Sequence, residues 1–134
     1  MAGERTIRTP TLNELSFAGG SESEVQLIIQ EIFEERAYLR EGMRLEPGDI
    51  VVDVGANIGL FAIFADEVCE HRCRICSFEP TPKTAGHLKK NLDHFGLDDR
   101  VEVIELGLTS FDGPREVDFT YLRRSPGGST MKWD

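Results

Sequence analysis

The sequence lacks the features that mark secreted and membrane proteins. Its start, Met1 to Thr6, is polar and leads into no long apolar run, so we expect neither a secretory signal nor a membrane span. The three cysteines are an odd number lying close together, which is not the paired framework of a small secreted protein. We therefore expect a cytoplasmic chain with free thiols and no membrane partner.

Basic residues are scarce. Fifteen Lys and Arg stand against 24 Asp and Glu, which gives a formal net charge of -9 at pH 7. Such a charge repels the phosphate backbone that nucleic-acid-binding proteins attract at many points. The composition therefore predicts no nucleic-acid partner and leaves a small molecule as the expected substrate.

The length allows one domain. A chain of 134 residues with 40% hydrophobic content can bury one core but not two. Residues 1–20 have no sustained period and end in Ala-Gly-Gly, so we predict a flexible N-terminal lead there. The periodic patterns begin after it, which makes 21–134 the domain.

A helix is predicted at the start of this domain. Either Ser21 with Glu24 or Ser23 with Gln26 can form a capping box. The apolar residues that follow share one helical face, so we expect an amphipathic helix that ends near Gly42.

Strands and helices then alternate. The predicted elements are strand 50–54, a helix from 60, strand 74–79, a helix from Pro82 to Gly96, strand 101–106 and strand 116–122, followed by a loop over 123–134. The β-branched run Ile50 to Val54 is typical of a parallel strand buried on both faces. This order predicts an α/β fold, a Rossmann-like parallel sheet with helices on both faces, whose ligand lies at the carboxyl ends of the strands.

A glycine-rich turn, Asp53-Val54-Gly55-Ala56-Asn57-Ile58-Gly59, joins the first strand of this sheet to its helix. Its small residues let the backbone approach a ligand. The pattern departs from the G-x-G-x-x-G of nicotinamide-binding proteins, and an acid precedes it, so that class remains only a minor alternative. S-adenosylmethionine carries no phosphate but an amino group, which a carboxylate attracts. We expect Asp53 to serve that group and Asn57 to adopt a positive φ.

Glu79 ends the second strand of the sheet. It follows Gly59 by about 20 residues, the offset at which an acid accepts hydrogen bonds from ribose hydroxyls. Strand, glycine loop, helix, strand and terminal acid together are hard to obtain by chance. The alternatives are a turn or helix-capping role for Asp53 and a solvated strand end for Glu79.

Through Glu31-Ile32-Phe33, Gly48 to Gly59 and Ser77-Phe78-Glu79-Pro80, the sequence resembles the FkbM-type methyltransferases. The resemblance runs from about Glu24 to the end, and Val-Gly-Ala-Asn-Ile-Gly is its specific part. It implies a class I fold and S-adenosylmethionine-dependent methylation, commonly of a hydroxyl on a sugar or natural product. It implies cofactor contacts at Asp53, Gly55, Ala56, Asn57, Gly59 and Glu79, with Leu108 near the adenine.

One departure from the family concerns length. The family's sheet continues with an Asp-containing strand and further strands on the substrate side, whereas this chain ends after the third parallel strand and one more. Strand 50–54 then becomes an apolar edge, which invites self-association or completion by another chain. We therefore expect a fragment, and a truncated cofactor-binding remnant without catalysis is the alternative function. No catalytic base is evident.

Cys69, Cys73 and Cys76 have the C-x3-C-x2-C spacing of radical S-adenosylmethionine enzymes, a minor alternative. The predicted fold opposes it, because Cys69 ends a helix and Cys76 lies within a strand. A zinc site with His71 is opposed by the same strand position. Buried cysteines are common in protein cores, so we expect structural thiols and no metal.

Overall fold

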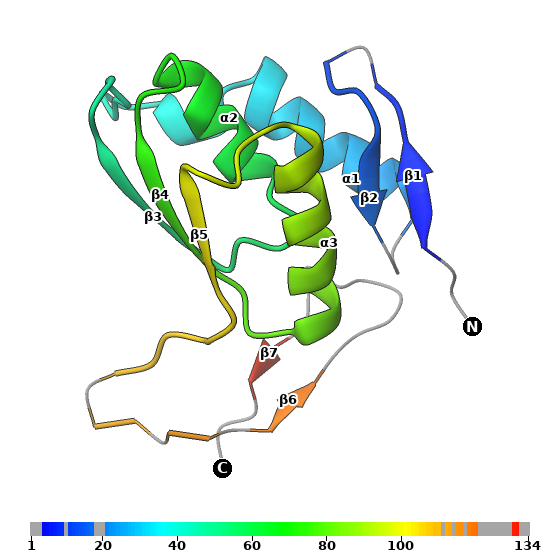
Figure 1. The fold of residues 1–134 in the computed structure, drawn as a ribbon, viewed down its shortest axis with the longest axis vertical. Helices are drawn as coiled ribbons and strands as arrows, with labels where there is room; N and C mark the ends of the chain where they lie inside the picture. The colour runs from blue at the N-terminus through cyan, green and yellow to red at the C-terminus, as the bar shows by residue number, and fades with distance from the viewer. Residues whose placement is uncertain are drawn as a thin grey trace.

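A computed structural model describes residues 4–9, 11–17, 21–110, 112–113, 115–116, 118–120 and 130–131. At its centre are the three parallel strands β3 (Ile50–Val54), β4 (Arg74–Phe78) and β5 (Val101–Ile104), in the order β3-β4-β5. The helices α2 (Leu60–Val68) and α3 (Pro82–His94) connect them (Figure 1). The predicted α/β class and parallel sheet are confirmed.

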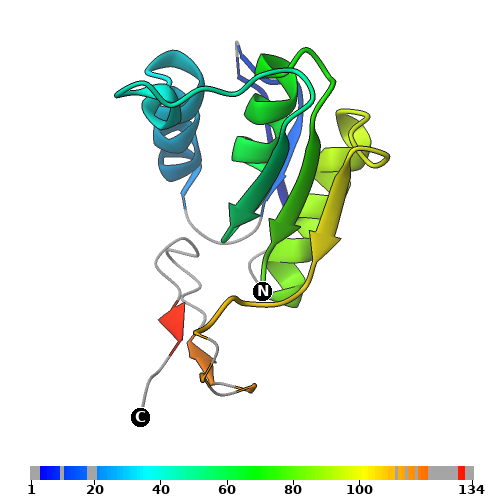
Figure 2. The same ribbon diagram turned by 90° about the vertical axis from the view of Figure 1, so that its left-hand side faces the viewer.

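The two faces of this sheet differ in burial. Val51, Asp53, Ile75 and Ser77 alternate toward the helices and are buried. Figure 2 shows α2 and α3 together behind the strands. The opposite face is open in the described part of the chain. The predicted placement of helices on both faces is therefore not found among these residues.

The open face exposes the outer side chains of β3. Ile50, Val52 and Val54 are 75%, 57% and 59% exposed. The prediction that β3 is buried on both faces is wrong here, because both connecting helices cross the same face. Within the described residues β3 pairs only with β4, so its other edge has no strand beside it.

The helix predicted to end near Gly42 is broken into three parts. These are α1 (Glu22–Ile29), a π-helical turn η1 (Gln30–Glu34) and a 3-10 turn η2 (Ala37–Leu39). The Ser21 cap is confirmed, since its Oγ accepts from the N–H of Glu24 at 3.2 Å. The helix ends early because Arg36 takes a left-handed conformation with φ 50°.

The structure differs from the expected flexible lead over 1–20. Within it, β1 (Arg5–Ile7) and β2 (Leu15–Phe17) form an antiparallel hairpin. Leu15 is fully buried, and β2 lies against α3. Each strand has only three residues, which is too short for a periodic pattern to be visible in the sequence.

α2 contacts the strands β3 and β4 and also the turn η1. Ala62, Phe64 and Ala65 are buried on different sides of it. Among the described residues, none of the helices combines the length and the hydrophobicity that a membrane span requires. Strands β6 (Phe119–Thr120) and β7 (Thr130–Met131) pair antiparallel. Most of the predicted strand 116–122 and loop 123–134 falls outside the described residues.

Candidate functional site

The glycine loop, residues 53–59, runs from the end of β3 to the start of α2. The N–H groups of Gly55 and Ala56 both donate to the carbonyl oxygen of Phe78 at 2.9 Å, which fixes the loop to the end of β4. Gly55 and Asn57 have φ values of 77° and 50°. Glycine and asparagine adopt this left-handed conformation most easily. The predicted positive φ of Asn57 is confirmed.

Glu79 lies against this loop and is 7% exposed. Its Oε2 accepts from the N–H of Asn57 at 3.0 Å, and its Oε1 accepts from the N–H of Thr81 at 2.9 Å. The alternative of a solvated strand end therefore does not hold. Each carboxylate oxygen can accept two hydrogen bonds, so Glu79 retains acceptor capacity for a hydroxyl donor such as a ribose.

Asp53 is the second acid at this edge of the sheet, and it is 8% exposed. Its Oδ2 meets no hydrogen-bond partner among the described residues. Burial raises the pKa of Asp53 to about 6, and the charge of Glu79 adds to this effect. Asp53 does not cap α2, which begins after Gly59 without a side-chain cap. A buried acid with a free oxygen is suited to a cationic ligand group.

The two glycines of the loop have different surroundings. A Cβ added at Gly59 would come within 2.7 Å of Leu88 Cδ1, so Gly59 is required where α2 begins against α3. A Cβ added at Gly55 would meet nothing within 4 Å. Gly55 therefore borders open space, where a ligand can approach, whereas Gly59 serves the packing of the two helices.

The remaining predicted site residues are Ala56 and Leu108. Ala56 is buried and takes part through its backbone. Leu108 is 45% exposed in the segment after β5. It takes no part in the hydrogen bonds that join the glycine loop to Phe78 and Glu79. The structure thus brings together Asp53, Gly55, Ala56, Asn57 and Glu79.

Asn91 supports the loop from α3 and was missed by the sequence analysis. Its Nδ2 donates to the carbonyl oxygens of Ser16 at 2.9 Å and Ile58 at 2.8 Å, and its Oδ1 accepts from the N–H of Ser16 at 2.6 Å. It is 1% exposed. The available signal was a polar residue on the same helical face as Leu88 and Leu92.

The three cysteines lie on two sides of the sheet. Cys69 and Cys73 are buried, and burial raises the pKa of both thiols, that of Cys73 to about 12. Cys76 lies on β4 beside Val52, toward the open face. A thiol with a raised pKa is a poor metal ligand. Within the described ranges, no group of three His, Cys, Asp or Glu residues is arranged to hold a metal ion.

Asp66, near the end of α2, forms a hydrogen-bonded ion-pair cluster with Arg100 and His71, distant from the loop. It is 1% exposed and accepts from Arg100 Nε at 2.8 Å, Arg100 Nη2 at 3.1 Å and His71 Nδ1 at 2.6 Å. Burial raises the pKa of Asp66, but the hydrogen bonds from Arg100 and His71 outweigh it and leave the pKa below its usual value. The cluster joins α2 to the start of β5 and is structural.

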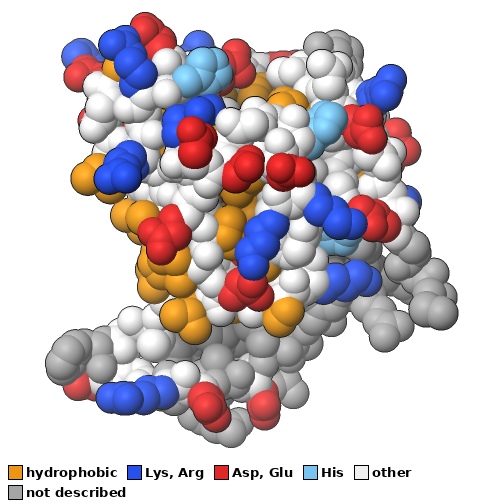
Figure 3. Space-filling model, in the orientation of Figure 1, with side chains coloured by type: hydrophobic (Ala, Val, Ile, Leu, Met, Phe, Trp, Pro, Cys, Tyr) orange, Lys and Arg blue, Asp and Glu red, His pale blue; other side chains and the backbone are white. Residues whose placement is uncertain are grey.

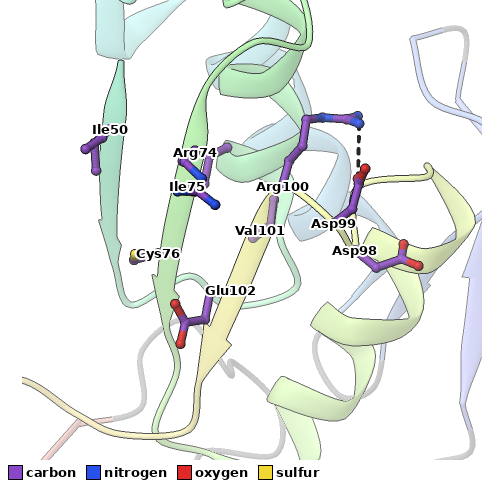
Figure 4. A pocket seen from close by; sticks show the side chains of 9 residues that line it. All are labelled: Ile50, Arg74, Ile75, Cys76, Asp98, Asp99, Arg100, Val101 and Glu102. Carbon is purple, nitrogen blue, oxygen red and sulfur yellow. Dashed lines mark hydrogen bonds and ion pairs between the residues drawn. The ribbon is translucent and has the colours of Figure 1, made fainter. Parts of the chain in front are cut away.

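A hollow lies at the amino edge of the sheet, opposite the glycine loop. Figure 4 shows its lining, which includes the first residues of the three strands, Ile50, Arg74 and Val101. Ligands of open parallel sheets bind at the other edge. The hollow is therefore not the candidate site.

Several curated proteins are similar to this chain. The 31-O-demethyl-FK506 methyltransferase FkbM of Streptomyces tacrolimicus is 41% identical over 98 residues, which are 72% of this chain and 36% of that protein. The methyltransferase sdnD of Sordaria araneosa is 34% identical over 126 residues, which are 92% of this chain and 47% of that protein. The AMB antimetabolite synthetase AmbE of Pseudomonas aeruginosa is 40% identical over 114 residues, which are 85% of this chain and 5% of that protein. The chain thus spans less than half the length of these relatives.

No family model matches the chain. Its fold is also found in solved structures. Pyrococcus horikoshii TYW2 in complex with MeSAdo superposes with a TM-score of 0.53 at 16% identity, over 78% of this chain and 36% of that one. A SAM-dependent methyltransferase from Aquifex aeolicus superposes with a TM-score of 0.50 at 19% identity, over 64% of this chain and 47% of that one.

Proposed function

The chain belongs to the FkbM-type methyltransferases by sequence, and we propose that it forms the S-adenosylmethionine-binding part of such an enzyme. The observation that carries the proposal is the pair of buried carboxylates, Asp53 and Glu79, on either side of the glycine loop. When bound, S-adenosylmethionine supplies an activated methyl group on a sulfonium.

The residues present fit this cofactor. The carboxylate of Asp53 suits its ammonium group, because a positive charge offsets the cost of burying an ionised carboxylate. The remaining acceptor positions of Glu79 suit ribose hydroxyls. The open side of Gly55 leaves room for the ligand next to the backbone. A cofactor bearing a pyrophosphate would instead meet two buried acids.

We propose that the methyl acceptor is a hydroxyl of a sugar or natural product rather than nucleic acid. The name of the FkbM relative states that it methylates an oxygen of a demethylated FK506. The net charge of -9 supports a small-molecule acceptor, since it opposes binding to phosphates. No described residue lies at the loop as an evident base for such a hydroxyl.

We also propose that further polypeptide completes the sheet beside β3. Two observations support this: the uncovered apolar face of β3, and the relatives' additional length, which is more than half of each. Figure 3 shows hydrophobic side chains gathered over the strands on the left of the molecule. Catalysis then depends on the completing segment, and cofactor recognition belongs to this chain.

Calorimetry with S-adenosylhomocysteine tests the proposal. We expect binding to the chain, a loss of about tenfold or more for Glu79→Ala, and no binding of NADH. Lys83→Ala is the matched control, because Lys83 is exposed on the helix that follows Glu79. If NADH binds and S-adenosylhomocysteine does not, the proposal is wrong.

A truncated cofactor-binding remnant without catalysis is the second candidate function. It is favoured by the absence of an evident base at the loop in the described residues. A methyl-transfer assay on the chain together with the completing segment separates the two candidates, because only the enzyme gives methylated product while both bind S-adenosylhomocysteine.

A further inference from the structure

Ser77 lies on β4 directly beside Asp53 on β3. The two residues are register partners in the parallel sheet, and both point toward the buried face. Cβ atoms of such neighbours stand about 5 Å apart, so their polar groups share one environment. Ser77 is fully buried at 0% exposure, two residues before Glu79.

Each side chain has a buried oxygen whose hydrogen-bonding capacity is unused among the described residues. Asp53 Oδ2 and the hydroxyl of Ser77 are the two buried side-chain oxygens without a hydrogen bond among the described residues. A buried polar group left unpaired costs on the order of 1–3 kcal/mol, and natural proteins contain few of them. Two such groups on neighbouring strands, at the edge of the sheet that carries the glycine loop, indicate one shared polar site.

The chemistry of the two groups is complementary. A hydroxyl can donate, and an ionised carboxylate can only accept. The two oxygens are not hydrogen-bonded to each other. One water between them would satisfy both. An apolar residue at position 77 would serve the core equally well if the hydroxyl had no such role.

We propose that Ser77 is a positioning residue of the cofactor site. Its hydroxyl donates through one buried water to Asp53 Oδ2 and holds that carboxylate ionised and oriented for the ammonium group of the cofactor. The inference rests on the proposed function and adds to it a residue that does not touch the ligand.

Two effects act on the ionisation of Asp53. Burial and the charge of Glu79 both disfavour its ionised form, and no other ionisable group among the described residues shifts its pKa. A donor that reaches Asp53 would stabilise its ionised form and so lower its pKa.

The test follows the ionisation of Asp53 by NMR titration of the full chain without ligand, alongside calorimetry with S-adenosylhomocysteine. For Ser77→Ala we expect the pKa of Asp53 to rise by about half a pH unit or more, because a hydrogen bond to the charged form is lost. We expect affinity for S-adenosylhomocysteine at pH 7 to fall about fivefold, the effect of one hydrogen bond. Cys76→Ala is the control, since Cys76 is the adjacent residue on β4 and faces the open side.

The opposite result is a more stable variant in which the pKa of Asp53 does not change. If the Ser77 hydroxyl has no partner, Ser77→Ala removes an unsatisfied group, so the melting temperature rises while the pKa of Asp53 stays unchanged. That outcome overturns the proposal.

A second pair of variants tests the proposal if Ser77→Ala folds poorly. Ser77→Thr and Ser77→Val have nearly the same shape and differ in the hydroxyl. We expect the Thr variant alone to keep the wild-type pKa of Asp53, and equal pKa values in the two variants overturn the proposal.

The ligand-free titration also separates this proposal from the proposed function. If the wild-type chain does not bind S-adenosylhomocysteine, the proposed function fails. The link between Ser77 and Asp53 is still decided by the titration.

Discussion

Ionised Asp53 lowers the stability of the folded chain, and the same carboxylate is proposed to bind the ligand. Its pKa is raised from 3.8 to about 6 by burial and by Glu79. The native state therefore holds this proton more tightly than the unfolded chain does. Stability falls as pH rises from about 4 through 6, because the ionised form is disfavoured only in the folded protein.

Asp53→Asn removes this loss of stability. We expect the variant's unfolding free energy, relative to wild type, to improve by about 2 kcal/mol between pH 4.5 and pH 7.5, since each pKa unit corresponds to about 1.4 kcal/mol and part of the effect is already present at pH 4.5. Urea unfolding at the two pH values measures it. Affinity for S-adenosylhomocysteine should fall in the same variant. A variant whose relative stability does not change with pH would contradict the raised pKa.

Substitutions at the two loop glycines are expected to separate an effect on stability from an effect on ligand affinity. Gly59→Ala introduces a contact of 2.7 Å with Leu88 at a φ of 93°, so we expect destabilisation of about 1–3 kcal/mol. Gly55→Ala has room but retains a left-handed φ, which costs about 1–2 kcal/mol. We expect the greater loss of stability for Gly59→Ala and the greater loss of S-adenosylhomocysteine affinity for Gly55→Ala. Urea unfolding and calorimetry on both variants check the two rankings, and a reversed order in either contradicts the roles given to these glycines.

Among the secondary structure elements, the β1–β2 hairpin depends on one side chain of α3. Asn91 makes three hydrogen bonds, two to Ser16 in β2 and one to Ile58 in the glycine loop. It is joined there by His87, whose Nδ1 lies 2.9 Å from Ser16 Oγ. The hairpin, α3 and the loop are therefore one unit, although Ser16 and Asn91 are 75 residues apart.

Asn91→Ala breaks this unit. Three buried backbone groups lose their partner, and we expect a loss of about 2–4 kcal/mol in unfolding free energy. Amide hydrogen exchange should speed up most at Ser16, whose N–H donates to Asn91. The exposed Lys90→Ala is no clean control because Lys90 pairs with Glu4, whereas Asp93→Ala lies on the exposed side of α3 and contacts neither element. Protection at Ser16 that is unchanged in Asn91→Ala would contradict this role.

The elements that sequence predicted best are those with long continuous patterns. Strand β3 and helix α3 have apolar residues at regular spacing, and their bounds match within about two residues. The hairpin escaped because its strands are three residues long and their partner is distant in sequence. The two acids of the candidate site were singled out by their spacing. Ser77 and Asn91 were not singled out, because the sequence pattern does not show which group a small polar residue in the core contacts.

In the described part of the molecule, helices cover one face of the sheet and leave the other face exposed. Helices cover the side of the sheet that holds Asp53 and Ser77, which is the side of the proposed cofactor site. The other side presents Ile50, Val52 and Val54 to solvent beside an unpaired strand edge in the described residues. Such an edge favours pairing with another polypeptide.

The chain alone should therefore associate with itself through this face. We expect light scattering to give a mass above that of the monomer, increasing with concentration, and Val52→Lys to reduce it, because a charge on the open face opposes apolar contact. Leu27→Lys is the matched control: Leu27 is 65% exposed on α1, away from the sheet, and should leave the mass unchanged. Since Val52 points away from Asp53, affinity for S-adenosylhomocysteine should persist in Val52→Lys. A wild-type chain that stays monomeric at high concentration would contradict the open face, and a Val52→Lys variant that loses the ligand would contradict the separation of that face from the cofactor site.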